Sequence, residues 1–422
     1  MHVGNYKLLE RFNRVFFVRR TLPVLSQAIL VFALFLVPGH LFAQIEINET
    51  NFPDENFRNY LSAKFANNGT TIPAGKKVTS LAVNGLSITN LKGVELFPEL
   101  TTLSCNSNKG LTSIDLSGLP NLTTLQASSS GLTSLDFSNN PKMTTINCTS
   151  SQLTSINVKN CSELQTLSLG NNNLTELDVT NNPKLTSLSI YQNDLSAIDL
   201  SKNTNLTKLH AFGCANLQNL DLSHNNKLTY LSVYDDKKMT GVDVSMLPAL
   251  QTLFCFKNNW EALDVTKNTK LVNLSCYGNS LTQLDLTNNT MLQSLVCFSN
   301  ALTSLDLSHN TALKYVSCYT NKLTTLVLPS DLSLVALDCH SNKLTSLSIP
   351  TTSASSLQFL SIRDNAFSSM DLSSFPNLSD SYSVKIADLT QPFSTPSSAN
   401  QKRSLRIYTD GNDAYLLAGG GY

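Results

Sequence analysis

The sequence predicts a solenoid of parallel β-strands, in which one short unit is repeated along an axis. Two observations support this prediction. Five segments between Leu250 and Leu344 follow one pattern, and their cysteines recur every 21 residues. These cysteines are Cys255, Cys276, Cys297, Cys318 and Cys339. A fixed period of about 20 to 50 residues is the signature of stacked structural repeats.

Each of these units reads LxxLxCxxNxL, which matches the leucine-rich repeat consensus with cysteine in one apolar position. In the LxC segment, strand alternation directs leucine and cysteine to one face, which we predict to be the core. The asparagine three residues later follows the strand, and its side chain can hydrogen-bond the backbone of a turn. We therefore predict a right-handed leucine-rich repeat superhelix with a parallel sheet on the concave face and a ladder of asparagines.

The repeats are predicted to occupy residues 78–380 as one uninterrupted stack. Counted from the first apolar residue of each unit, nine of the thirteen intervals between Leu100 and Leu378 are 21 residues, three are 22 and one is 23. A coil this short has no room for a convex helix, so we expect extended or short 3₁₀ segments there. The second half of each unit predicts another ladder, formed by Asn140, Asn182, Asn203, Asn225, Asn268, Asn289 and Asn310.

Residues 44–77 do not follow the repeat and predict a helical cap. The segment NFPDENFRNYLSAKF has Pro53 in a position that a first helical turn tolerates, with Asp54 and Glu55 beside it. Its apolar residues have helical spacing: Phe57, Tyr60, Leu61 and Phe65. A cap of this kind would cover the bare end of the core. The following segment, ANNGTTIPAG, has no carboxylates, so we expect no metal site there.

The first residues, 1–43, have the layout of a secretory signal peptide. Basic residues precede the apolar run from Ala28 to Val37, and the small residue Ala43 follows it. Ten apolar residues are too few to span a bilayer. The alternative is a membrane anchor, because the basic segment is long and Leu41 is not small. After cleavage we expect a secreted or surface protein without membrane insertion.

Thirty basic residues balance thirty acidic ones, so the formal net charge is zero. No overall field therefore favours nucleic acid as a partner. Nothing in the composition indicates an oligomeric state.

Seven of the nine cysteines occupy the inward position of the strand, namely Cys105, Cys148 and the five at 21-residue spacing. Other repeats have Ala127, Leu169, Ile190, Ala211, Val233 or Ile362 there, which indicates that cysteine acts as a small hydrophobe with a free thiol. Disulfides between successive coils are the alternative. Zinc binding is disfavoured because zinc motifs place cysteines in closely spaced pairs. Cys161 and Cys214 fall in predicted turns and are the candidates for reactive thiols.

The candidate binding surface follows from the position just after the inward cysteine. This position is polar in early repeats and then aromatic in seven successive repeats: Tyr191, Phe212, Tyr234, Phe256, Tyr277, Phe298 and Tyr319, followed by His340 and Arg363. Tyr230, Phe254, Tyr315 and Phe359 are expected on neighbouring rows. We predict that these side chains face solvent on the concave side, in a column about 30 Å long. An exposed apolar stripe favours binding of an extracellular protein or glycan. The alternative is that the rings only stabilise the sheet.

Nothing in the sequence favours an enzyme or a cofactor. The six histidines are scattered, and no serine or cysteine nucleophile is fixed beside His210 or His340. The Asp of the LDLS segment recurs in nine units, whereas catalysis needs one distinct site, so these carboxylates are interpreted as structural or solvated. The other class considered is a structural surface or matrix spacer without a specific ligand.

The 21-residue repeat with its cysteine ladder, the NFPDENFRNYL helix and the ITNLKGVELFPEL segment resemble internalin J-like leucine-rich repeat proteins of bacterial surfaces. The resemblance covers Asn51 to Leu378 and implies a secreted or surface-attached, non-enzymatic adhesin in host contact or biofilm formation. No LPxTG-type wall motif is present. In the tail, residues 381–422, the segment RSLRIYTDGNDAYLL predicts a β-hairpin. This segment resembles the start of the β-sandwich sorting domain of type IX secretion.

Overall fold

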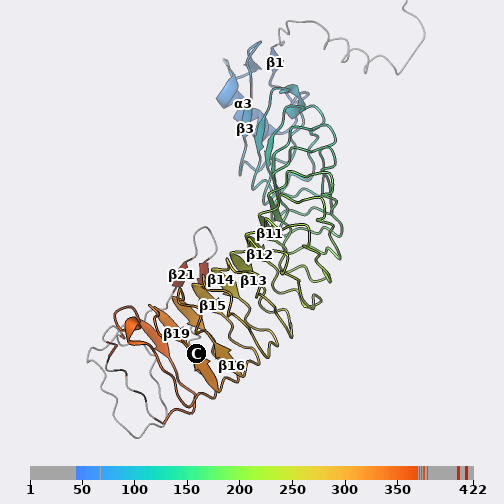
Figure 1. Cartoon of the computed structure of the whole chain (residues 1–422). Coiled ribbons are helices and arrows are strands. Elements are labelled where there is room, and N and C mark those ends of the chain that lie inside the picture. Colours follow the sequence, from blue (N-terminus) through green and yellow to red (C-terminus); the bar gives the residue numbers. More distant parts are fainter. Residues whose placement is uncertain are drawn as a thin grey trace, which may run out of the picture.

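A computed structural model describes residues 44–66, 68–368, 370, 372, 374–375, 378, 406–408 and 414–416. The predicted signal peptide, residues 1–43, and most of the predicted tail, residues 381–422, lie outside the described residues. The described chain forms an arc-shaped solenoid whose main sheet lies on the inner side of the arc (Figure 1). The predicted leucine-rich repeat superhelix is confirmed.

The main sheet has 14 parallel strands that follow one another in chain order. They are β3 (Ser80–Ala82), β4 (Thr102–Ser104), β5 (Thr124–Gln126), β7 (Thr145–Asn147), β9 (Thr166–Ser168), β10 (Ser187–Ser189), β11 (Lys208–His210), β12 (Tyr230–Ser232), β13 (Thr252–Phe254), β14 (Asn273–Ser275), β15 (Ser294–Val296), β17 (Tyr315–Ser317), β19 (Ala336–Asp338) and β20 (Phe359–Ser361). The middle residue of each strand is a buried aliphatic.

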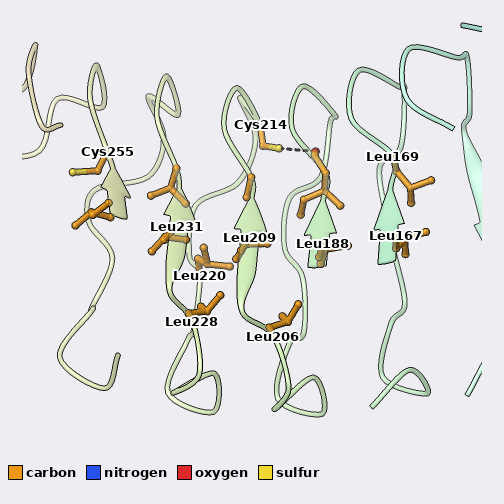
Figure 2. Close-up of a cluster of buried hydrophobic side chains, with 14 of the residues drawn as sticks. Leu167, Leu169, Leu188, Leu206, Leu209, Cys214, Leu220, Leu228, Leu231 and Cys255 are labelled. Atoms are coloured by element: carbon orange, nitrogen blue, oxygen red, sulfur yellow. Dashed lines mark hydrogen bonds between the residues drawn. The ribbon is translucent and has the colours of Figure 1, made fainter. Parts of the chain in front are cut away.

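The core consists of rows of equivalent apolar side chains from successive coils (Figure 2). Leu188, Leu209 and Leu231 are register partners on neighbouring strands, and each is fully buried. Backbone pairing continues beyond the three-residue strands, because Cys255 N–H donates to the Ser275 carbonyl over 2.9 Å. The inward position of the cysteines is therefore held in register by the same parallel ladder.

The convex side contains short extended pieces and 3₁₀ turns, as predicted. Two small parallel sheets pair β6 (Ser134–Asp136) with β8 (Ser155–Asn157) and β16 (Ser304–Asp306) with β18 (Thr325–Val327). The 3₁₀ segments are η2 (Val94–Leu96) and η3 (Thr351–Ser353). The recurrent aspartates serve the turns of this side, since Asp264 Oδ1 accepts from Thr266 N–H over 2.9 Å. This arrangement agrees with their structural interpretation.

Both predicted asparagine ladders are present. In the concave ladder, Asn279 Nδ2 donates to the carbonyls of Cys255 and Cys276, each over 2.9 Å, and so joins two coils. In the convex ladder, Asn289 Nδ2 donates to the carbonyls of Val265 and Asn268 over 3.0 and 2.9 Å. Each amide thereby donates to carbonyls in the turns and links neighbouring coils.

All nine cysteines are free and buried. The interpretation of Cys161 and Cys214 as reactive is wrong, because they occupy ladder positions inside the turns. Cys161 stands 21 residues from both Asn140 and Asn182, and Cys214 donates its thiol hydrogen to the Ile190 carbonyl over 3.3 Å (Figure 2). Burial raises the pKa of Cys161 to about 12 and that of Cys214 to about 11. Both thiols therefore stay protonated and unreactive at neutral pH.

The N-terminal end is covered by helix α3 (Glu55–Phe65) and an antiparallel pair, β1 (Ile45–Glu46) and β2 (Thr71–Ile72). Phe57 and Leu61 of α3 are fully buried, while Tyr60 and Phe65 pack partly buried against the core. Pro53 precedes the N-cap residue Asp54 and lies outside the first helical turn. The helical cap is thus present, and it begins two positions later than a proline in the first helical position would suggest.

Beyond the repeats, β21 (Arg406–Tyr408) and β22 (Ala414–Leu416) pair antiparallel. No helix within the described part of the chain is both long and apolar enough to cross a membrane.

Candidate ligand-binding surface

The concave face is three residues wide in each coil, because side chains alternate between core and surface. In the coil of β13, Leu253 and Cys255 are fully buried in the core, and Thr252, Phe254 and Phe256 take the alternating outward positions. We call these three positions the outer row, the middle row and the aromatic column. The aromatic column consists of Tyr191, Phe212, Tyr234, Phe256, Tyr277, Phe298, Tyr319 and His340.

The aromatic column is one continuous stack. Successive ring centroids are 4.0–4.6 Å apart, and the interplanar angles are 3–17°. Isolated aromatic pairs prefer offset or edge-to-face arrangements. Here the parallel strands hold equivalent residues in register at about 4.8 Å, which enforces face-to-face neighbours. The ring spacing is slightly shorter than the strand spacing, as expected on the inner side of a curved sheet.

The exposure of these rings differs from the prediction in two places. Phe254 and Phe256 were expected to face solvent, but they are only 4% and 7% exposed. The reason is contact with neighbouring rings, since Phe256 is stacked between Tyr234 and Tyr277. Neither phenylalanine belongs to the leucine and cysteine core, so both keep their outward direction.

The other rings of the aromatic column are half-buried. Their faces are covered by the adjacent rings. Tyrosine and phenylalanine alternate along the column, so hydroxyls occur in every second coil from Tyr191 to Tyr319. Burial, reinforced by the charge of Asp338, raises the pKa of Tyr319 to about 12, so its hydroxyl stays a neutral donor.

The remaining predicted site residues do not form a single group. Tyr230 contacts His210 at 4.6 Å and Phe254 edge-on at 5.6 Å between ring centroids. Tyr315 and Phe359 lie in the outer row but are separated by Ala336. Arg363 follows the column in the coil of β20 and pairs with Asp364 at 3.0 Å. The structure thus joins Tyr230 and Phe254 to one cluster and leaves the other three apart.

At the C-terminal end of the column, His340 and Asp338 have the geometry of an ion pair, which the sequence does not reveal. His340 stacks on Tyr319 at 4.4 Å, and its Nδ1 lies 2.5 Å from Asp338 Oδ1. Asp338 precedes the inward Cys339, so strand alternation puts it on the same surface as His340. This contact fixes the orientation of the imidazole at the end of the stack.

Two backbone features position the column and are missed by the sequence reasoning. The residue after each ring turns the chain with a positive φ, as at Lys257 with 58° and Gly278 with 65°. Gly170 marks the start of the stack, because a Cβ there would lie 2.2 Å from Tyr191 Cε1. Gly170 therefore makes room for the first ring. In the sequence it can be identified because it occupies the column position of the coil directly before seven successive aromatic residues.

The middle row also contains residues that the prediction omitted. Ser168, Ser189, His210 and Ser232 line a hollow of about 310 Å³ beside the first rings of the column. The serines recur just before the inward position, which is the spacing that identifies them. Within the described residues, no group of three or more His, Cys, Asp or Glu side chains is arranged to hold a metal ion.

A solved structure described as the functional domain of InlJ from Listeria monocytogenes, which includes a cysteine ladder, is similar over most of the chain. Its sequence identity is 30%, the match covers 80% of this chain and 74% of that one, and the TM-score is 0.62. The chain belongs to the internalin J-like leucine-rich repeat family. The predicted resemblance is confirmed.

Other comparisons place this internalin J-like protein in the wider leucine-rich repeat fold. The family model of the leucine-rich repeat domain of the endo-β-N-acetylglucosaminidase EndoS matches residues 52–203. A leucine-rich repeat protein of Leptospira interrogans is 21% identical, with 69% of this chain and 85% of that chain covered and a TM-score of 0.55.

The Arabidopsis receptor kinase HAESA, solved with the peptide hormone IDA and the co-receptor SERK1, is 20% identical, with 82% and 62% covered and a TM-score of 0.59. At these identities the last two structures show the fold alone. No curated protein matches the sequence of this chain.

Proposed function

We propose that this internalin J-like protein is a non-enzymatic, secreted or cell-surface adhesin that binds an extracellular protein through its aromatic column. The observation that carries the proposal is the continuous stack of eight rings along the concave face. Such a stripe is far longer than a local packing contact, and exposed apolar stripes on soluble proteins usually serve binding. The partner would belong to a host surface or to a biofilm.

A polypeptide fits this column better than sugar rings that stack on aromatic faces. The faces are already occupied by neighbouring rings, and the open edges carry partial positive charge. The tyrosine hydroxyls add hydrogen-bond donors at intervals of two coils. Carbonyl oxygens of an extended polypeptide complement both features. HAESA, which shares the fold, was solved in complex with a peptide hormone.

The proposed location rests on the sequence of residues 1–43, which has the basic and apolar segments of a signal peptide. Secretion also accounts for the absence of reactive thiols among the nine buried cysteines, because exposed cysteines would be oxidised outside the cell.

The competing proposal is a spacer whose rings only stabilise the solenoid. Stacked pairs contribute about 0.5 to 1.5 kcal/mol each beyond their buried area, so this role is energetically substantial. The two proposals differ in what the ring edges do. A spacer needs the stack but not the tyrosine hydroxyls.

The test is to change Tyr234, Tyr277 and Tyr319 to Phe, which keeps the stack and removes three hydroxyls. Full-length protein is applied to an array of extracellular host proteins and biofilm matrix proteins. We expect the variant to lose at least tenfold in affinity for the bound protein, because each hydroxyl contributes about 0.5 to 1.5 kcal/mol. Its melting temperature should change by only a few degrees.

A matched control changes Met246 and Met291 to Ser, since these exposed apolar residues lie outside the three concave rows. This variant should bind like the wild type. If the tyrosine variant binds with unchanged affinity, or if the native protein binds no protein on the array, the adhesin proposal is rejected and the spacer is favoured.

A further inference from the structure

A hollow of about 310 Å³ lies on the concave face beside the first three rings of the aromatic column. Its lining consists of four serines, three tyrosines, His210 and Phe212. Its volume is at the lower end of the range for small-molecule sites. The hollow therefore has room for one small ring or group, and it is distinct from the column edges.

The hollow exists because the middle row has small side chains at this point. Ser168, Ser189 and Ser232 leave space above the sheet, and His210 lies between the last two. The next residue of the row, Phe254, is the register partner of Ser232 and fills the corresponding space. Phe254 thus closes the C-terminal end of the hollow, where its ring meets Tyr230 edge-on.

The lining is neutral and rich in hydroxyl groups. Four serines and three tyrosines supply hydroxyls that can both donate and accept, and His210 adds an imidazole. The lining contains no carboxylate, ammonium or guanidinium group. A charged ligand would lose its hydration without gaining a counter-charge there, so the hollow favours a neutral, hydrogen-bonding ligand.

Ser232 lines the hollow and is the residue that we expect a ligand to contact. Its side chain is buried, at 1% exposure, and its Oγ has no hydrogen-bond partner within the described part of the chain. An unsatisfied buried hydroxyl is unfavourable for the folded protein. A ligand hydroxyl that reaches Ser232 would relieve this cost as well as add a contact.

We propose that this hollow binds one neutral monosaccharide unit of an extracellular glycan. A sugar ring carries hydroxyls on all sides, which matches donors and acceptors that converge from four strands, β9 to β12. A neutral amide side chain of a peptide enters from one direction and uses fewer of them. This site goes beyond the protein-binding role of the column: the first three rings of the column form one of its walls, but its serines and His210 lie outside the column.

The experiment measures binding of neutral monosaccharides to the full-length protein by saturation-transfer NMR and by calorimetry. The probes are glucose, galactose, mannose, N-acetylglucosamine and N-acetylgalactosamine, with glucuronic acid as the charged comparison. Ser232→Ala should weaken binding of the preferred sugar about fivefold to tenfold, as expected for one lost hydrogen bond. The same change should leave the melting temperature unchanged or higher, because it removes an unsatisfied hydroxyl.

Ser317→Ala is the matched control. Ser317 lies in the same row, is equally buried at 1% exposure and also lacks a partner for its Oγ within the described residues, but it is outside the hollow. It should leave sugar binding intact, whereas Ser189→Phe should fill the hollow and abolish binding. The proposal is overturned if no neutral sugar binds, if only glucuronic acid or a peptide binds, or if Ser232→Ala and Ser317→Ala behave alike.

Discussion

At the scale of single residues, Asp236 is an aspartate in a position of the concave ladder of asparagines. It occupies the position of Asn258 one coil earlier and is fully buried. Its Oδ1 accepts from Cys214 N–H over 2.6 Å, while its Oδ2 has no partner among the described residues. By register, this oxygen stands where Asn258 has the amide that donates to two carbonyls. A protonated carboxyl can donate its single hydrogen there, but a carboxylate cannot donate.

This substitution makes stability depend on pH. Burial, with a contribution from the charge of the exposed Asp235, raises the pKa of Asp236 to about 8. The folded state therefore holds a proton that the unfolded chain releases near the ordinary value of 3.8. Because the folded pKa is the higher one, the stabilisation is complete below pH 3.8 and is lost as pH rises through about 8.

We predict that the free energy of unfolding falls as pH rises from about 4 to about 8 and that Asp236→Asn removes this part of the pH dependence. The variant should be more stable than the wild type by about 1 to 3 kcal/mol at pH 9, because its amide can donate to the same carbonyls. Denaturant unfolding can be followed with Trp260, the only tryptophan of the chain. Its indole donates to the Met239 carbonyl, and Met239 N–H donates to the backbone carbonyl of Asp236.

Asp235→Asn is the control, since Asp235 is exposed and contributes only a secondary part of the shift. It should keep most of the pH dependence. Parallel slopes of stability against pH for the wild type and Asp236→Asn would show that Asp236 is ionised in the folded protein at neutral pH.

At the scale of elements, Asp54 joins helix α3 to the first coil. Its Oδ1 caps the helix at Phe57 N–H over 2.9 Å, and its Oδ2 accepts from Thr89 N–H over 2.8 Å. Burial alone would raise the pKa of Asp54, but hydrogen bonds from Thr89, Phe57 and Asn90 outweigh it and hold the pKa below its ordinary value. One carboxylate thus both caps the helix and hydrogen-bonds the first coil.

We predict that Asp54→Ala lowers the free energy of unfolding by about 1 to 3 kcal/mol, through the lost cap and the buried N–H groups left without an acceptor. The wild-type contribution is present at neutral pH and disappears as pH falls through the lowered pKa. Hydrogen exchange of the α3 amides should accelerate in the variant. Glu55→Ala changes the neighbouring exposed carboxylate and should have little effect; an equal effect of both changes would assign the loss to helix charge instead of the cap.

At the scale of the whole molecule, the period of the sequence determines the fold because each coil repeats one set of inward positions. The ladders of Asn279 and Asn289 and the buried cysteines could therefore be predicted from spacing. The direction of the column could be predicted as well, but the burial of Phe256 could not, since it depends on contact between rings of different coils. The hollow at Ser232 could not be predicted, because serine also recurs in the middle row outside the hollow, at Ser275 and Ser317, so spacing alone does not locate the space.

The column also predicts how stability is distributed along the solenoid. In a repeat protein, stability is approximately a sum of terms from each coil and from contacts between neighbours. Replacing one ring inside the column by Ser removes two stacking contacts. Replacing the adjacent pair Tyr277 and Phe298 removes three, whereas replacing the separated pair Tyr234 and Phe298 removes four.

We therefore predict that the separated double variant, Tyr234→Ser with Phe298→Ser, is less stable than the adjacent one, Tyr277→Ser with Phe298→Ser. The difference should be about 0.5 to 1.5 kcal/mol, the contribution of one stacked pair. Each pair contains one Tyr and one Phe, so the loss of ring surface is matched. Double-mutant cycles from urea unfolding give the coupling directly, and it should appear for Tyr277 with Phe298 but vanish for Tyr234 with Phe298. Coupling of equal size in both cycles would mean that the rings act through the curvature of the whole solenoid and not through contact with their neighbours.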